Sequence, residues 1–371
     1  DIAIVGLAGR YPGARNMQEF WANLKAGKDC VTPVPEERLD LWQTPKNGEM
    51  WGGFLQDVDR FDPLFFHISP REAERMDPQE RLFLECVYET LQDAGYTRQT
   101  LGQGQGDAGK VGVFVGVMYE EYQLYGAQEQ LKGRPVAVNG NAASIANRVS
   151  YFCNFHGPSM AVDTMCSSSL TAIHLACQHI QQGSCEAAIA GGVNISIHPN
   201  KYIALNQGEF LSSKGRCESF GEGGDGYVPG EGVGAVLLKP FTQAVEDGDH
   251  IYGVIKGTAV NHGGKTHGYT VPNPNAQTEV IQHALWEAKI DPQTIDYIEA
   301  HGTGTALGDP IEIAGLTKAF EAYTQERQYC AIGSVKSNIG HAESAAGIAG
   351  ISKILLQLKY GQFVPSFIRR S

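Results

Sequence analysis

The chain has 371 residues, which is above the length at which a single simple core usually stops growing. It therefore allows two domains or one large duplicated one. Hydrophobic residues make up 42% of the chain and charged residues 19%, a balance typical of globular proteins. The formal net charge of −12 argues against a nucleic-acid binder, which would show a basic stripe, and against docking on anionic lipid. It leaves room for a local basic patch that receives a small acidic partner.

The cysteines and the first residues indicate the compartment. Eight cysteines are spread along the chain without a CxxC pair, a pattern typical of reduced thiols in a cytosolic protein. The opening segment, DIAIVGLAGRYPG, lacks the basic segment and the long apolar stretch of a signal peptide. No apolar run reaches the length that spans a membrane. We therefore expect a cytoplasmic protein that is not bound to a membrane.

The first half of the chain is predicted to alternate strands and helices. Short apolar runs predict buried strands at 1–6, 111–117, 160–164 and 187–194. Helical spacing predicts helices at 17–26, from Asp77 to Gly95, at 144–152 and at 167–183, the last capped by Ser167. The polar stretches that run up to about residue 68 and over 118–140 are predicted to be loops.

The second half repeats this rhythm. We predict strands at 234–240, 252–260, 295–301 and 330–337, and helices at 276–288, 309–320 and 342–361. Strands that alternate with helices imply βαβ units and a largely parallel sheet. A strand that feeds a small-residue helix occurs in AVDTMCSSSLTAIHLA and again in AIGSVKSNIGHAESAAGIAGI, which suggests an internal duplication. We therefore expect two halves, of about 1–245 and about 246–371.

The first motif with chemical potential is AVDTMCSSSL (161–170), where Cys166 stands between a predicted strand and a predicted helix. Backbone N–H groups at a helix start favour a thiolate, and the thiolate is the nucleophilic form of cysteine. The competing interpretation is an inert buried thiol. It suits five other cysteines better than it suits Cys166, namely Cys86, Cys153, Cys177, Cys185 and Cys330.

Two further motifs place histidines and a lysine at strand ends. In IEAHGTGTALGDPIE (298–312), His301 enters a glycine–threonine turn that can approach a substrate closely, although a lone histidine here is more often structural. In GSVKSNIGHAES (333–344), Lys336 and His341 flank a turn before a long helix, where the lysine could hold a carboxylate, orient a histidine or be incidental. One cysteine, two histidines and one lysine, on three strand-end turns, form a strong combined signal.

These residues resemble the β-ketoacyl synthases of polyketide and fatty-acid assembly, which belong to the thiolase superfamily. The resemblance extends over nearly the whole chain and is strongest to ketosynthase domains of modular polyketide synthases. GVMYEEYQ and SFGEGGDGYVPGEG are similar to the branch that receives extender units from a separate acyltransferase. The matching motifs are IAIVGLAGRYPGA (2–14), FFHISPREAERMDPQERLFLE (65–85), VDTMCSSSL (162–170), GRCESFGEGGDGYVPGEG (215–232), EAHGTGTALGDPIE (299–312) and SVKSNIGHAESAAG (334–347).

The resemblance implies a layered α/β/α/β/α thiolase fold, usually a homodimer, and a decarboxylative condensation. Cys166 would accept the acyl chain from a carrier protein, and His301 and His341 would face a malonyl-type extender on a second carrier. Lys336 would be the supporting cation, bonded to a carboxylate such as Glu312. No metal or diffusible cofactor is implied, because both substrates are carried on phosphopantetheine. The implied substrate-binding residues are Thr303, Thr305, Met165 and Asn338.

The chain departs from the family pattern at two points. Met165 stands where alanine is the commoner residue, and its flexible thioether could reshape the acyl pocket. The sequence stops at FVPSFIRRS, before a further strand region and a glycine–phenylalanine-rich loop, so we expect a chain that is truncated at its C-terminus. The expected partners are acyl carrier proteins and neighbouring synthase domains. Basic candidates for carrier docking are Lys214, Arg216, Arg369 and Arg370.

Other readings of the same residues are weaker. A zinc site could use His262 and His267, or His174 and Cys177, but the chain has neither HExxH nor a CxxC pair. A phosphate-binding loop at NHGGKT would need glycine where Ala259 stands. A non-elongating homologue that passes or gates acyl chains stays open as the alternative function. A thiolase acting on coenzyme A esters is less favoured, because thiolases use a second cysteine where this chain offers two histidines.

Overall fold

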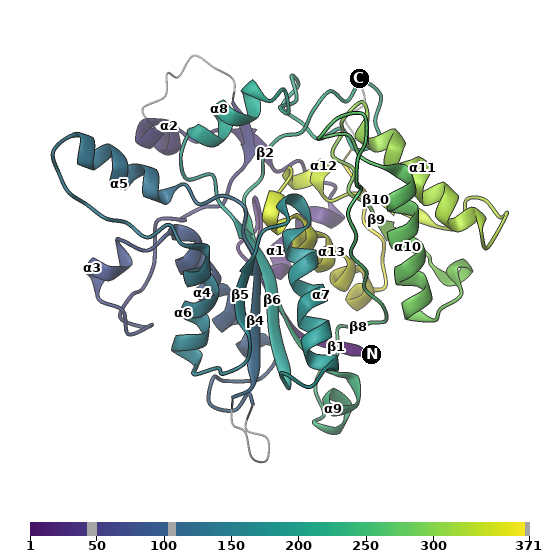
Figure 1. Cartoon of the computed structure of the whole chain (residues 1–371), viewed down its shortest axis with the longest axis horizontal. Coiled ribbons are helices and arrows are strands. Elements are labelled where there is room, and N and C mark those ends of the chain that lie inside the picture. Colours follow the sequence, from purple (N-terminus) through teal and green to yellow (C-terminus); the bar gives the residue numbers. More distant parts are fainter. Residues whose placement is uncertain (43–49, 103–108, 368–371) are drawn as a thin grey trace.

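A computed structural model describes residues 1–42, 50–102 and 109–367, and in it helices cover both faces of a six-stranded sheet (Figure 1). The strand order is β5-β4-β6-β7-β1-β8. The strands are β1 (Ile2–Arg10), β4 (Val111–Gly116), β5 (Ser159–Val162), β6 (Ala187–Asn194), β7 (Gly232–Pro240) and β8 (Gly253–Ile255).

The sheet is mixed, so the prediction of a largely parallel sheet is wrong. β4 runs parallel to β5 and β6, whereas β6–β7, β7–β1 and β1–β8 are antiparallel. Asn194 at the end of β6 pairs with Gly232 at the start of β7. The segment between them therefore returns to the same end of the sheet instead of crossing over it, which a strand–helix alternation cannot reveal.

Alternate residues of the strands form two hydrophobic cores, one on each face of the sheet. Val113 and Val115 of β4 belong to the core under α4 (Pro78–Asp93) and α6 (Ala142–Cys153). Phe114, between them, belongs to the core under α7 (Ser168–Gln181) and α13 (Ala346–Tyr360). The sheet is thus covered by α4 and α6 on one face and by α7 and α13 on the other.

Small residues let α7 and α13 approach each other closely at the centre of the molecule. A Cβ on Gly347 would lie 2.5 Å from Leu170 Cγ and 2.9 Å from Ser169 Oγ. Ser169 Oγ also accepts a hydrogen bond of 2.9 Å from the Ile348 N–H. Strand β4 also packs closely against Ser169, because a Cβ on Gly116 would lie 2.5 Å from the Ser169 nitrogen. The start of α7, which follows Cys166, is therefore tightly packed from two sides.

A second, two-stranded parallel sheet lies beyond α13. It consists of β9 (Tyr297–Glu299) and β10 (Ala331–Gly333), and in Figure 1 it lies between α13 and the pair α10 (Pro274–Ala288) and α11 (Gly308–Glu321). A 2.8 Å ion pair between Lys353 and Glu299 joins α13 to β9. The layers follow the order α, β, α, β, α, which confirms the predicted layered fold.

Single elements match the sequence unevenly. The strand at 187–194 has the predicted bounds, but the predicted loop over 118–140 contains helix α5 (Tyr122–Leu131). Only Gly126 is buried in α5, so no apolar stripe marks this helix in the sequence. The remaining elements are β2 (Val31–Pro33), β3 (Trp51–Gly53), α1 (Met17–Lys25), α2 (Glu36–Trp42), α3 (Pro70–Ala73), α8 (Asn200–Gln207), α9 (Phe241–Glu246), α12 (Lys336–Ile339) and the 3₁₀ helices η1 (Met165–Ser167), η2 (Pro292–Thr294) and η3 (Glu343–Ala345).

All eight cysteines are free thiols. Over the described ranges, no helix combines the length and the apolar character needed to cross a membrane.

Candidate active site

Cys166 lies in the tight turn η1, between the end of β5 and the start of α7. Met165, just before it, has a φ of +56°, and its N–H donates to Asp163 Oδ1 at 2.8 Å. Ser167 does not cap α7 as predicted, because its hydroxyl donates back to the Thr164 carbonyl at 2.9 Å. The turn is instead closed by the Thr164 N–H, which donates to Ser168 Oγ at 2.9 Å.

The environment of Cys166 favours the thiol over the thiolate. Burial is the first cause and the carboxylate of Glu343 the second, and together they raise the pKa of Cys166 to about 11. The ammonium of Lys336 acts in the opposite direction but is outweighed. The expectation that the helix start stabilises a thiolate is therefore wrong for the unacylated site.

His301 follows β9 and is held through its backbone by Glu312. The two carboxylate oxygens of Glu312 accept the N–H groups of His301 and Gly302, at 2.6 and 2.8 Å. Within the described part of the chain, Glu312 forms no ion pair with Lys336, which corrects the predicted bond between them. Burial lowers the pKa of Lys336, and the carboxylate of Glu299 opposes this effect more than that of Glu312. The direct role of Glu312 is to fix the turn that carries His301.

His341 is buried, with 1% of its surface exposed, and its ring lies edge-on to that of His301 with 5.4 Å between centroids. Its Nδ1 accepts a 2.9 Å hydrogen bond from the Glu343 N–H, so in the neutral ring Nε2 carries the proton. Burial, and then the positive charge of Lys336, lower the pKa of His341 well below its usual value. The same two causes lower the pKa of His301. Both rings are thus neutral at physiological pH.

Cys166, His301 and Lys336 line one cavity of about 650 Å³. Its walls are mostly apolar and come from α13, from Leu170 of α7 and from the turns that carry Cys166, His301 and Lys336. His341 contacts this group through the ring of His301. The remaining lining residues are Thr164, Met165, Ser167, Pro272, Glu299, Ala300, Val335, Ala346, Gly347, Gly350, Ile351 and Ile354.

The predicted substrate-binding residues are placed differently from one another. Met165 lines the cavity and is 56% exposed. Thr303 and Thr305 lie on the turn after His301, with 3.3 Å between their hydroxyl oxygens. Asn338 is buried, and its amide donates to the Lys28 carbonyl at 3.1 Å, so its side chain serves a structural contact and does not line the cavity.

The basic residues predicted for carrier docking have partners inside the chain. Lys214 Nζ donates to Glu218 at 3.0 Å, and Arg216 pairs with Asp29 at 2.7 Å and lies over the ring of Trp51. Arg369 and Arg370 lie outside the described residues.

The histidines and cysteines considered for zinc do not gather. Across the described ranges, no group of three or more histidine, cysteine, aspartate and glutamate side chains could hold a metal ion. His174 Nδ1 is engaged with the Thr258 hydroxyl at 2.7 Å, and His262 Nδ1 accepts the Gly264 N–H at 2.9 Å.

The comparison with protein families is decisive. Residues 1–244 match the family described as beta-ketoacyl synthase, N-terminal domain, and residues 252–368 match beta-ketoacyl synthase, C-terminal domain. The chain belongs to the β-ketoacyl synthase family. The predicted resemblance and the thiolase-like α/β fold are thereby confirmed.

Several relatives of this ketosynthase chain are named polyketide synthases. It is 68% identical to Polyketide synthase PksL of Bacillus subtilis and 62% identical to Polyketide synthase ThaG of Burkholderia thailandensis. These matches cover 99% and 98% of the chain but only 8% and 7% of those proteins. Among solved structures, the oxazolomycin ketosynthase domain OzmH KS7 of Streptomyces albus is 54% identical with a TM-score of 0.94. That match covers all of this chain and 64% of the solved one.

A second ketosynthase structure supports the same assignment. The ketosynthase from module 6 of the bacillaene synthase of Bacillus subtilis is 42% identical, with a TM-score of 0.91. The match covers 99% of this chain and 63% of the solved one.

The structure of this ketosynthase also reveals polar residues beside the site that the sequence reasoning missed. Lys201, Glu343, Asn194 and Tyr227 are buried together next to His341. Glu343 is part of a motif recognised in the sequence, where it was assigned only to a predicted helix. Lys201 carries no signal in the sequence, because its partner lies 142 residues away.

Proposed function

We propose that this chain is the condensing domain of a polyketide synthase and joins a Cys166-bound acyl chain to a malonyl-type extender. The observation that carries the proposal is the shared cavity of about 650 Å³ lined by Cys166, His301 and Lys336. A nucleophilic sulfur, a neutral imidazole and a cation therefore face the same space, with His341 edge-on to His301. This is the set of groups that an acyl transfer followed by an enolate attack requires.

The first step is acyl loading. The sulfur of Cys166 attacks the carbonyl carbon of an acyl thioester on a carrier protein, the new carbon–sulfur bond forms, and the carrier thiolate leaves. The proton of the Cys166 thiol passes to the departing sulfur, which leaves as the phosphopantetheine thiol. Burial keeps the resting Cys166 protonated, so this proton transfer belongs to the reaction. The apolar walls from α7 and α13 suit an acyl chain.

The second step is decarboxylation and carbon–carbon bond formation. The malonyl carboxylate leaves as CO₂, and its electron pair moves into the thioester to form an enolate. The N–H groups of neutral His301 and His341 stabilise the enolate oxygen, because donors aimed at developing charge act most strongly in a water-poor site. Lys336 adds a positive charge. The enolate carbon attacks the acyl-Cys166 carbonyl, and the Cys166 thiolate leaves and takes up a proton.

The proposed partners follow from this chemistry. Both substrates would be delivered on the phosphopantetheine of acyl carrier proteins, and the hydroxyls of Thr303 and Thr305 are candidates to contact that arm. No metal or diffusible cofactor takes part in the scheme. A homodimer is proposed from the position of β5, which lies at an edge of the main sheet. A cytoplasmic location, a separate acyltransferase as donor, and the halves at about 1–245 and 246–371 stay predictions.

Mass spectrometry tests the proposal directly. The chain is incubated with an acyl-carrier thioester and a malonyl carrier, and Cys166 and the carriers are followed over time. We expect acylation of Cys166 and then a 3-ketoacyl product on the second carrier. Cys166→Ala removes loading, whereas His301→Ala keeps loading and loses condensation by roughly 100-fold or more, the usual contribution of an acid–base group.

The outcomes separate the candidate functions. Acylation of Cys166 without chain extension would support the acyl-transfer or gating alternative instead. Absence of acylation in a folded chain would contradict both functions.

A further inference from the structure

A buried ion pair lies next to His341. Lys201 of α8 and Glu343 of η3 have no exposed side-chain surface, and Lys201 Nζ lies 2.6 Å from Glu343 Oε2. Desolvation of two charges costs several kcal/mol per ion, so such a pair contributes little net stability compared with apolar residues. Its presence beside a catalytic histidine therefore calls for a role in the site.

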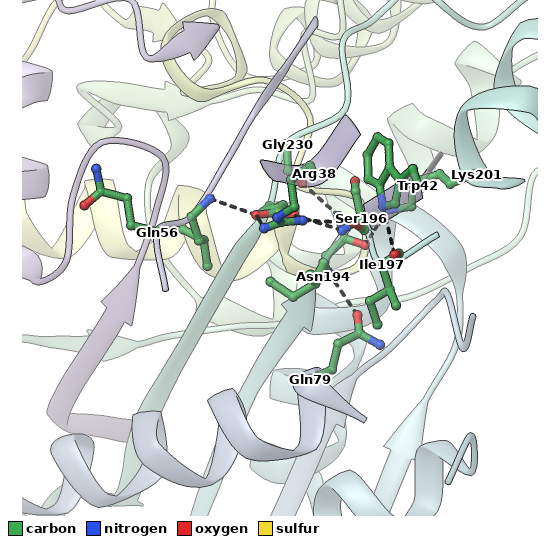
Figure 2. Close-up of polar contacts among 12 residues, drawn as sticks. Arg38, Trp42, Gln56, Gln79, Asn194, Ser196, Ile197, Lys201 and Gly230 are labelled. Carbon is green, nitrogen blue, oxygen red and sulfur yellow. Dashed lines mark hydrogen bonds and ion pairs between the residues drawn. The ribbon is translucent and has the colours of Figure 1, made fainter. Parts of the chain in front are cut away.

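Glu343 is held by more than its lysine. Asn194, the last residue of β6, donates its amide to Glu343 Oε2 at 2.9 Å. The same amide donates to the Gly230 carbonyl at 2.8 Å (Figure 2). Tyr227 donates its hydroxyl to Glu343 Oε1 at 3.3 Å, and its ring packs on His341 with 4.8 Å between centroids. Both oxygens of the carboxylate are thus anchored to elements outside η3.

A second buried hydrogen-bond network, centred on Glu231, lies beside Asn194. Glu231 accepts the Arg38 guanidinium at 2.9 Å and the Ser196 N–H at 3.1 Å, next to the end of β6 (Figure 2). A movement of the Glu343 carboxylate would therefore have to disturb two connected buried networks.

The backbone of Glu343 explains what this anchoring achieves. Glu343 has a φ of +50°, a left-handed conformation that costs a non-glycine residue about 1 kcal/mol or more. In this conformation its N–H donates to His341 Nδ1 at 2.9 Å. Such strain persists only where the surroundings hold the residue firmly in place. Here Lys201, Asn194 and Tyr227 hold the carboxylate, and His341 accepts the N–H.

We propose that Glu343 is a positioning residue whose carboxylate, clamped by Lys201, Asn194 and Tyr227, keeps its own N–H aimed at His341 Nδ1. The ring of His341 is thereby fixed as the tautomer that carries its proton on Nε2. The inference rests on the proposed condensing function and adds to it a part that acts only through His341.

The test begins with a readout that needs no turnover. Nitrogen NMR of the ¹⁵N-histidine-labelled chain, with His341 assigned by its loss in His341→Gln, reports which ring nitrogen carries the proton. We expect a single Nε2–H form in the parent chain and a mixture of tautomers in Glu343→Gln. The matched control is Lys239→Met, which breaks a buried lysine–aspartate pair elsewhere in the fold and leaves the His341 spectrum unchanged. An unchanged Nε2–H form in Glu343→Gln would overturn the proposal.

Activity then distinguishes positioning from folding. In Glu343→Gln we expect decarboxylation of the malonyl carrier to fall roughly 10- to 100-fold, as for a misdirected acid–base group. Acyl loading should stay within about threefold, because removal of the Glu343 charge lowers the pKa of Cys166 and does not hinder the nucleophile. Equal losses in loading and decarboxylation would mean a general structural defect and would contradict the proposal.

The double variant Lys201→Met/Glu343→Gln removes the buried charges together. It should recover the melting temperature lost by either single variant, since a neutral buried pair needs no desolvated charge. Decarboxylation should stay low, because the carboxylate clamp is gone. Recovery of decarboxylation together with stability would show that the pair serves packing alone. If the parent chain neither loads nor decarboxylates, the condensing function fails, while the tautomer measurement still tests Glu343.

Discussion

The neutral state of His341 can be tested through the pH dependence of folding. In the unfolded chain a histidine takes up a proton near pH 6.5, whereas in the folded chain burial and Lys336 lower the pKa of His341 well below that value. Below pH 6.5, His341 therefore binds a proton in the unfolded state but not in the folded state. The folded state is therefore fully stable with respect to this group above pH 6.5, and it loses stability as the pH falls, because protonation of His341 favours the unfolded chain.

The size of the penalty follows from the ring's burial. With 1% of its surface exposed, His341 gains little from solvent screening. A proton bound only by the unfolded state costs about 1.4 kcal/mol of unfolding free energy at pH 5.5 and about 2 kcal/mol at pH 5.0. The variant His341→Gln cannot titrate, so its free energy of unfolding should fall by about 2 kcal/mol less than that of the parent between pH 8 and pH 5.

Urea unfolding at pH 8.0, 6.5, 5.5 and 5.0 measures this difference, and the comparison cancels every titration that parent and variant share. The matched control is His262→Gln. His262 also accepts a 2.9 Å bond at Nδ1 from the N–H two residues on, but its ring is exposed. The control measures the effect of a histidine-to-glutamine change that leaves His341 in place. Identical pH dependence in the parent and in His341→Gln would mean that the folded chain protonates His341, and the neutral-donor mechanism would fall with it.

Two further substitutions test the packing around the site. Gly116→Ala places a Cβ 2.5 Å from the Ser169 nitrogen, so we expect a loss of about 1–3 kcal/mol in urea unfolding and slower acylation of Cys166. In the control Gly253→Ala the new Cβ meets only the flexible ends of Leu355 and Leu358, and loading at the parent rate in both variants would refute the coupling. Asn338→Ala should cost about 1 kcal/mol of stability through its bond to the Lys28 carbonyl while condensation keeps its parent rate. Slower condensation would instead support the original prediction that Asn338 binds the substrate.

The sequence was most informative where local pattern decides structure. The run at 187–194 is continuous, apolar and short, and the strand has the predicted bounds because both of its faces are buried. Strand direction depends on where the chain returns, and the return of 195–231 to the same end of the sheet leaves no local signature. Helix α5 escaped detection for the opposite reason, since a helix with one buried residue has no periodic apolar face.

The candidate site could be predicted as a set of residues but not as a geometry. Cys166, His301 and Lys336 come from three separate strand ends, and the cavity that unites them arises from the packing of the two sheets around α7 and α13. Side chains of neighbouring residues in one motif also point to different places. Lys336 lines the cavity, whereas Asn338, in the same short helix, turns its amide to Lys28. A motif therefore identifies a turn, and the turn's conformation decides which of its side chains reach the substrate.

Lys201 and Lys336 are both buried near the site, but only Lys201 has a carboxylate partner in the described ranges. This difference fits the proposed reaction. The charge of Lys201 is offset by Glu343 at 2.6 Å, whereas Lys336 has no ion pair in the described ranges and stands in the cavity with His301. A malonyl carboxylate is an anion in the ground state and leaves as neutral CO₂, so a second free cation would stabilise the substrate more than the transition state. In the proposed reaction, Lys336 would supply positive charge in the cavity where the enolate forms, while the charge of Lys201 is offset by Glu343. Removal of Glu343 would therefore harm decarboxylation twice, by releasing the His341 tautomer and by exposing the charge of Lys201.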